Sequence, residues 1–216
     1  EACQIGEAIG NPWGQSFSQM LIGNIYFQRG EMTRAMDTMR ESIRLAQVSG
    51  FLMPQIWTKA ELGALYGELG AVDQGIELAT QAYTLAIERF PRGTSRIHGV
   101  LARLALLQSD VPQAESHLEQ SKANTFNDFA QRAFDRQPLV EIETALAKKD
   151  FARALQLADS LLGSSSSIYM RVFQSGLLYL KGNVLLAQGD AQAAREVWLN
   201  ALTEAEQIGS RWMQWQ

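Results

Sequence analysis

The sequence predicts an all-α fold, a right-handed α-solenoid of about five helical hairpins. Three observations predict it. A turn signal recurs every 39 or 40 residues, a small residue follows each turn at a fixed distance, and apolar residues between the turns keep helical spacing. A period of this length indicates stacked helical repeats, because one hairpin cannot bury its apolar face alone and needs a neighbour.

The inter-helix turns stand near residues 30, 70, 109, 149 and 189. Each turn joins a first helix to a second helix that must fold back on it. A bulky side chain would not fit where the two helices cross most closely. Five residues after each turn start the chain places a small residue, and these are Ala35, Gly75, Ala114, Ala154 and Ala194.

The first two hairpins are the most regular. Gly23 and Tyr26 lie on the first helix of the first hairpin, and Gly63 and Tyr66 take the equivalent places in the second. Gly63 and Gly75 should let the two backbones of the second hairpin approach each other, because neither carries a side chain. The pattern therefore predicts a close crossing at this pair.

The later hairpins depart from this pattern. The third turn, Ser109-Asp110, has no glycine. Pro138 falls in the first helix of the fourth hairpin and predicts a break there, because proline ends or kinks a helix. The loop Gly163–Ser167 is expected to be the most mobile connection. In the fifth hairpin, Trp198 follows Ala194 by four residues and should lie in the core.

These positions resemble the tetratricopeptide repeat (TPR), which has Gly and Tyr on the first helix and Ala with an aromatic residue on the second. A period near 40 is longer than the family's period of about 34. It resembles the extended repeats in the sensor regions of signal-transduction ATPases, including MalT-like transcriptional activators. That resemblance implies a setting in signal transduction and transcription regulation. The segments that match the tetratricopeptide repeat are Ile22-Gly23-x-x-Tyr26, Leu62-Gly63-x-x-Tyr66 and Ala194-x-x-x-Trp198.

We expect residues 1–216 to form a single TPR-like repeat domain that is a fragment of a longer array. The segments Ile9–Trp13 and Ile208–Trp212 are similar and lie 199 residues apart, which equals five repeat steps. Self-association through exposed repeat ends is also expected, since a cut array exposes apolar faces that normally meet a neighbour. Ile5 and Ile9 would then meet Trp212 and Met213.

Signatures of catalysis and metal binding are missing from the sequence. His98 and His117 are its only histidines and Cys3 is its only cysteine, and none of them stands at a metal-ligand spacing. The sequence also contains no glycine-rich phosphate loop and no nucleophile elbow. We therefore predict that the chain is not an enzyme and uses no cofactor and no metal.

Composition favours a soluble protein of the cytoplasm. The chain is 46% hydrophobic and 19% charged, and no apolar run approaches the length that crosses a bilayer, about 18 residues. Its net charge of −4 disfavours non-specific binding to nucleic acid or to anionic membranes. We expect a cytoplasmic segment that contacts neither.

The first helices of such a stack are expected to line a concave groove that binds the ligand. Arg96 and Arg103 share a helix face, and Arg136 follows Arg96 by one repeat. Because guanidinium groups bind carboxylates and phosphates, an anionic ligand is expected. An ion pair between Arg103 and Glu143 is the structural alternative. Replacing Arg96 and Arg136 is expected to leave stability unchanged. The predicted ligand contacts are Asn24, Trp57, Arg96, Arg103, Arg136, Glu143, Tyr179 and Asn183.

The predicted function is binding. The chain would act as a non-catalytic module that recognises a protein, a peptide or a small ligand within a larger signalling or transcription-regulating protein. The alternative is a structural scaffold that self-assembles and recognises no separate ligand.

Overall fold

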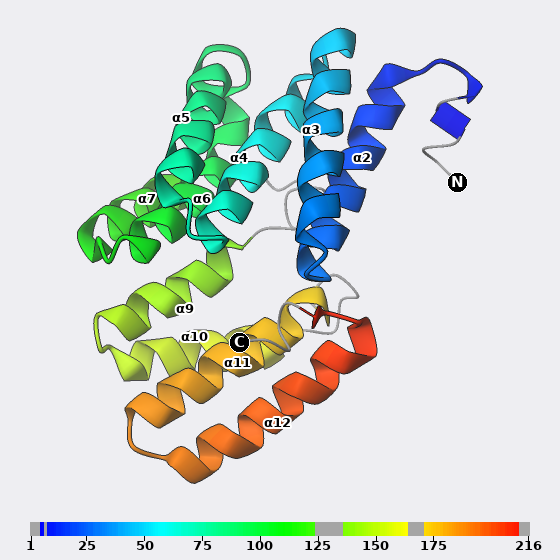
Figure 1. The fold of residues 1–216 in the computed structure, drawn as a ribbon. Helices are drawn as coiled ribbons and strands as arrows, with labels where there is room; N and C mark the ends of the chain where they lie inside the picture. Colours follow the sequence, from blue (N-terminus) through cyan, green and yellow to red (C-terminus); the bar gives the residue numbers. More distant parts are fainter. Residues whose placement is uncertain (1–4, 7, 124–135, 164–170, 212–216) are drawn as a thin grey trace. The chain divides into compact units, whose positions relative to one another are not determined.

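The computed structural model describes residues 5, 6, 8–123, 136–163 and 171–211. These residues form ten α-helices, one short 3₁₀-helix and no strand, so the predicted all-α, TPR-like fold class is confirmed. The elements in chain order are α2 (Pro12–Gln28), α3 (Met32–Ser49), α4 (Leu52–Glu68), α5 (Val72–Arg89), η1 (Pro91–Gly93), α6 (Thr94–Leu107), α7 (Val111–Ala123), α9 (Gln137–Ala147), α10 (Phe151–Gly163), α11 (Arg171–Ala187) and α12 (Ala191–Ile208) (Figure 1).

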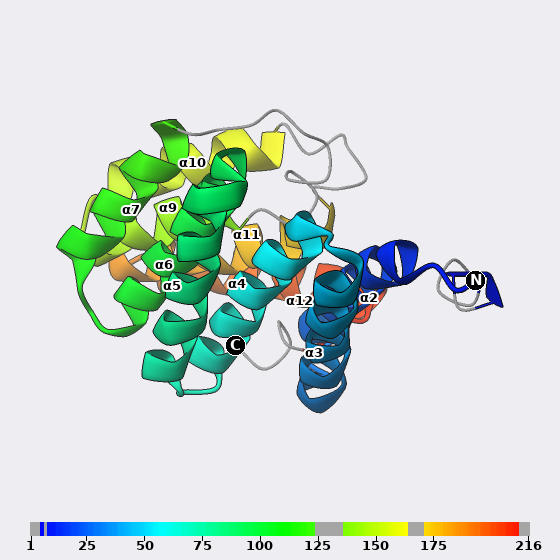
Figure 2. The same cartoon turned by 90° about the horizontal axis from the view of Figure 1, so that it is seen from above.

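The chain divides into two compact units, Glu1–Phe126 and Asn127–Gln216. In the first unit α2 pairs with α3, α4 with α5, and α6 with α7. In the second unit α9 pairs with α10, and α11 with α12. Figures 1 and 2 show the two helices of each pair side by side, so the described helices form five hairpins.

Successive hairpins within a unit stack in the same way. Each second helix packs on the next first helix, as α3 does on α4, α5 on α6 and α10 on α11. The first helices also contact one another, α2 with α4, α4 with α6, and α9 with α11. One face of each unit is therefore built from first helices, as in repeat solenoids.

The five hairpin turns share one backbone geometry. In each turn one residue has a left-handed φ, and the next N–H donates to the carbonyl five residues earlier at 2.9 or 3.0 Å. This is the bond that closes a Schellman helix end. Glycine adopts the left-handed φ freely, whereas other residues adopt it at a cost. The φ values are 73° at Gly30, 87° at Gly70, 62° at Ser109, 60° at Lys149 and 93° at Gly189.

An aspartate follows each of the last three turns and caps the second helix. In each case Oδ1 accepts a hydrogen bond from the backbone N–H three residues ahead, at 3.0 Å for Asp110, 3.1 Å for Asp150 and 3.0 Å for Asp190. Such a cap stabilises a helix start by about 1 kcal/mol. The two turns that lack glycine, at Ser109 and Lys149, are therefore each followed by a capping side chain.

The helix crossings carry the small residues that the sequence places there. The five predicted small residues are all buried. The two helices of the second hairpin cross closely, because a Cβ atom added to Gly63 would lie 2.6 Å from the carbonyl oxygen of Gly75. Leu62 is buried beside this crossing, and Tyr66 and Leu78 pack against the same core cluster. The predicted approach of two backbones at Gly63 and Gly75 is thus present.

Pro138 and Trp198 occupy positions that suit their chemistry. Pro138 lies in the first turn of α9, where its missing N–H has no helical partner to lose. Trp198 is partly buried in the fifth hairpin and donates from Nε1 to the carbonyl oxygen of Tyr179 at 3.2 Å. Residues 164–167 of the predicted mobile loop lie outside the described residues.

Candidate functional site

Two of the predicted groove residues are buried inside the first unit. The amide of Asn24 donates to the carbonyl oxygen of Met20 at 3.0 Å, and the side chain is 3% exposed. Trp57 is 1% exposed, and its Nε1 donates to the carbonyl oxygen of Gly93 at 3.2 Å. The expectation that these two side chains project freely from the inner face is wrong, because each already has its hydrogen bond within the protein.

Arg96 is buried in the same unit. Its Nε and Nη2 atoms each lie 2.9 Å from Oε1 of Glu61, and the side chains are 3% and 2% exposed. The guanidinium carbon lies 5.5 Å from the centre of the Trp57 ring, within the range of a cation–π contact. Arg96 on α6 therefore neutralises Glu61 on α4 and is not an open anion-binding group.

Arg103 is the groove residue of the first unit that remains partly accessible. Its Nε lies 2.8 Å from Oε1 of Glu68, and its Nη2 lies 3.1 Å from Oε2, so the contact is bidentate. The side chains are 24% and 9% exposed. The sequence suggested Glu143 as the partner of Arg103, whereas the structure pairs it with Glu68 on the neighbouring first helix.

The predicted residues of the second unit are all partly buried. Arg136 precedes α9 as its N-cap residue, and Glu143 lies on that helix. Tyr179 and Asn183 lie on α11, which contacts α9. Three of these side chains come from the two first helices of the unit. Arg136 lies just before α9, whereas its predicted counterpart Arg96 lies within α6.

A pocket that the sequence did not predict lies in the first unit, between α5, α6 and α7. It has a volume of about 260 Å³. His98 on α6 and His117 on α7 meet in it, with their Nδ1 atoms 3.2 Å apart. The ring of Tyr83 lies beside His98, at 4.9 Å between ring centres. The pocket is lined by Ile76, Thr80, Tyr83, His98, Leu101, Ala105, Gln113, His117 and Gln120.

One sequence signal could have located this histidine pair. Both histidines lie within about three helical turns of the Ser109-Asp110 turn, on the two helices which that turn folds together. Their separation of 19 residues fits no metal-binding motif, so a search along the chain misses it. Ser95 and Ser121 show the same hairpin pairing, with their hydroxyl oxygens 3.2 Å apart.

Burial lowers the pKa of both histidines. The pKa of His98 falls from 6.5 to about 4, first because burial disfavours the charged ring and then because His117 would repel it. Burial also lowers the pKa of His117. Both imidazoles are therefore neutral at pH 7, so one ring donates its Nδ1–H and the other accepts it.

We expect the stability of the protein to fall as the pH is lowered from 7.5 to 5.5. The unfolded chain binds more protons in this range because its histidine pKa is higher than that of folded His98. The unfolding free energy should therefore drop by about 1 kcal/mol. Urea titrations at both pH values measure the drop.

The chain has only two histidines, so the double variant His98→Gln/His117→Gln should lose most of this dependence. An unchanged dependence in that variant would refute the assignment.

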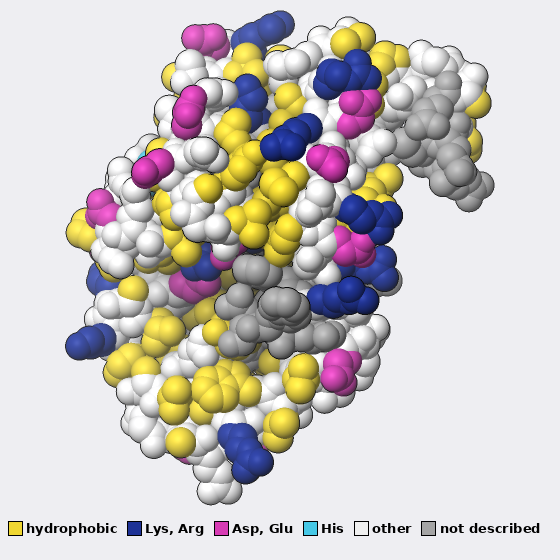
Figure 3. Space-filling model, viewed as in Figure 1, with side chains coloured by type: hydrophobic (Ala, Val, Ile, Leu, Met, Phe, Trp, Pro, Cys, Tyr) yellow, Lys and Arg dark blue, Asp and Glu magenta, His cyan; other side chains and the backbone are white. Residues whose placement is uncertain are grey.

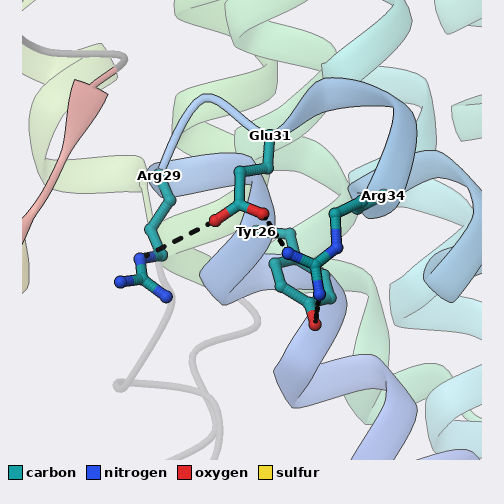
Figure 4. Close-up of polar contacts among 4 residues, drawn as sticks. All are labelled: Tyr26, Arg29, Glu31 and Arg34. Carbon is teal, nitrogen blue, oxygen red and sulfur yellow. Dashed lines mark hydrogen bonds and ion pairs between the residues drawn. The ribbon is translucent and has the colours of Figure 1, made fainter.

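Arginines of α3 hold the tyrosines at the repeat motif positions. Figure 4 shows Arg34 over Tyr26, with Nη2 donating to the tyrosine hydroxyl at 2.7 Å and Glu31 between Arg34 and Arg29. Arg40 on the same helix reaches the second hairpin, where its Nη2 donates to the hydroxyl of Tyr66 at 2.6 Å. These tyrosine hydroxyls are thus engaged in structural contacts.

The outer surface of α3 carries charges of both signs. Basic and acidic side chains lie beside one another over this helix in Figure 3, which agrees with ion pairs of Arg40 with Asp37 and of Arg44 with Glu41. The hydrogen bond from Arg44 lowers the pKa of Glu41. This surface has no extended field of one sign that would attract a polyanion.

Two classes of feature are not found in the described part of the chain. No helix there is long and apolar enough to cross a membrane. No group of three or more His, Cys, Asp or Glu side chains is arranged there to hold a metal ion. The histidine pair supplies two such side chains, one fewer than a group of three.

The first hairpin agrees with a known repeat family. Residues 18–48 match the tetratricopeptide repeat. The matched segment covers most of α2, the turn at Gly30 and nearly all of α3. It includes the Tyr26 and Arg34 contact of Figure 4.

Solved structures extend this similarity of fold. Two structures from Podosopora anserina contain the nearly identical TPR-like repeats of a protein described as a kinesin light chain, and each is 17% identical to this chain. The alignment with the first structure covers 88% of this chain and 94% of the chain in that structure, with a TM-score of 0.50. The second covers 88% and 95%, with a TM-score of 0.48. No curated protein matches this chain.

The fold is therefore TPR-like over most of the chain, and the family match covers the first hairpin. Repeats of this class generally mediate protein–protein interaction and are typically non-catalytic scaffolds.

Proposed function

We propose that this chain is a binding module that recognises a protein or peptide segment. The observation that supports the proposal is the contact between successive first helices, α9 with α11 in the second unit. Repeat solenoids use the face built from first helices for recognition. Arg136, Glu143, Tyr179 and Asn183 are the proposed contacts, and in the first unit Arg103 is the corresponding one.

The wider setting is also a proposal. We infer that the module belongs to a larger cytoplasmic protein of signalling or transcription regulation, within one repeat domain that continues the array. Support comes from the repeat period near 40, which resembles that of MalT-like regulators. In a narrower form of the same proposal, the module senses a small ligand.

A peptide library displayed on phage and selected against the full chain tests recognition. Arg136→Gln should weaken the selected peptides roughly 10-fold to 100-fold, because a hydrogen bond to a charged group contributes about 1.5 to 3 kcal/mol. The matched control is Arg195→Gln, since Arg195 is exposed on α12, a second helix. Equal affinity of both variants and the parent chain would reject the first-helix face as the binding surface.

The alternative function is a self-assembling scaffold, and one observation favours it. Ile5, Ile9 and Trp13 near the start of the described chain are 55%, 68% and 52% exposed. The partners expected for Ile5 and Ile9, which are Trp212 and Met213, lie outside the described residues. If the library yields no peptide and light scattering shows assembly that Ile9→Asp abolishes, the scaffold replaces the binding module as the proposed function.

A further inference from the structure

The pocket between α5, α6 and α7 brings together the only two imidazoles of the chain. His98 is 2% exposed and His117 is partly buried, and each is fixed on its own helix of the third hairpin. Their Nδ1 atoms are 3.2 Å apart, and both residues line a pocket of about 260 Å³. Two imidazole nitrogens that can ligate a metal are therefore held together beside a pocket.

The separation of the two nitrogens suits a shared metal ion. In proteins, zinc lies about 2.0 to 2.1 Å from each histidine nitrogen. Two nitrogens 3.2 Å apart at that radius subtend roughly 100° at the metal, close to the tetrahedral angle. For both Nδ1 lone pairs to point to one place, the two rings must turn from their hydrogen-bonded orientation.

We propose that His98 and His117 bind one divalent transition-metal ion through their Nδ1 atoms, Cu²⁺ more tightly than Zn²⁺. Imidazole is a ligand that both ions favour, and copper(II) exceeds zinc in the general order of divalent affinities. Both histidines line the pocket, which offers space for the remaining ligands.

Metal binding needs both Nδ1 lone pairs. A neutral imidazole is the form that binds a metal. In the metal-free pair one ring carries its proton on Nδ1. When the metal binds, that proton moves to Nε2 of the same ring, so both Nδ1 lone pairs become available and no net proton is released.

The lining leaves room for further ligands. A volume of about 260 Å³ exceeds the space of one water, about 30 Å³, several-fold. Thr80, Gln113 and Gln120, whose side chains contain oxygen atoms, are among the lining residues. No residue that lines the pocket is charged at pH 7, so the bound ion would keep its positive charge and attract an anionic or water ligand.

The test is calorimetric titration of the full chain with CuSO₄ and ZnSO₄ at pH 7.5. The chain carries Cys3→Ser to remove its only thiol as a competing ligand. We expect one equivalent of tight binding, with Cu²⁺ the tighter ion. Since mutation of even outer-shell partners changes metal affinity about 10- to 100-fold, loss of either histidine should weaken it at least tenfold. Electron paramagnetic resonance of the copper form should show two imidazole nitrogens.

His117→Gln is the decisive variant because His117 is less buried than His98 and its loss disturbs the core less. Circular dichroism checks that the variant stays folded. Arg195→Gln on α12 serves as the matched control and should bind both ions as the parent chain does. Equal copper affinity of folded His117→Gln, a copper spectrum without two imidazole nitrogens, or no stoichiometric binding would each overturn the proposal and leave a purely structural hydrogen bond.

Discussion

Arg96→Ala should destabilise the protein by about 3 to 5 kcal/mol, as expected when one member of a buried ion pair is removed. The variant would lose the cation that neutralises Glu61, and Glu61 itself is 2% exposed. It would also lose the contact of the guanidinium with the Trp57 ring. This result would reverse the expectation from sequence that replacing Arg96 leaves stability unchanged. Urea unfolding followed by circular dichroism measures the change.

Arg103→Ala is the matched control, because Arg103 pairs with Glu68 across the same two helices but is 24% exposed. The Arg103→Ala variant should lose less stability, about 1 kcal/mol, since solvent screens the pair. The double variant Arg96→Met/Glu61→Leu should recover much of the lost stability, because apolar side chains can replace a buried pair. If Arg96→Ala costs no more than Arg103→Ala, burial of the pair is not what stabilises this position.

Gly63→Ala should also destabilise strongly, by about 1 to 3 kcal/mol or more. The added methyl group would lie 2.6 Å from the carbonyl oxygen of Gly75 and 3.3 Å from the backbone nitrogen of Ala79. Both are backbone atoms of α5, so the whole helix must shift to relieve the contact. A leucine at this position would be worse. Thermal unfolding measures the effect as a lower melting temperature.

Gly23→Ala is the control for this crossing. Gly23 is equivalent to Gly63 in the first hairpin, but the nearest atom to its added methyl group would be Cγ of Met39, at 2.8 Å. A methionine side chain has several rotatable bonds and can turn aside. Gly23→Ala should therefore cost less than Gly63→Ala. Equal costs would show that the backbone approach at Gly75 is not the limiting contact.

Features that repeat along the chain were accessible from the sequence. A hairpin requires a left-handed turn residue and a small residue at the crossing, and both requirements recur every 39 or 40 residues. Gly63 and Gly75 could be recognised because each satisfies a local backbone demand. The helical fold class followed from the same repetition.

The candidate site was less accessible, because it depends on which partner a neighbouring helix supplies. The register correctly places Arg96 on the face where first helices meet, but Glu61 on the adjacent helix occupies its guanidinium. Trp57 and Asn24 similarly find backbone acceptors. The histidine pair forms because α6 and α7 fold together at the Ser109-Asp110 turn, and only the distances of the two histidines from that turn, not a metal-ligand spacing, indicate it.

The shared geometry of the five turns has a consequence for how an array of this kind changes in length. Every second helix follows a left-handed residue at the same turn position and the same backbone hydrogen bond. A duplication or deletion of one whole period would therefore rejoin a helix to a turn of the same backbone geometry. Loss of a single residue within a helix would instead rotate everything beyond it by about 100° and turn its apolar face away. Recombination can thus add or remove complete hairpins far more readily than it can trim one.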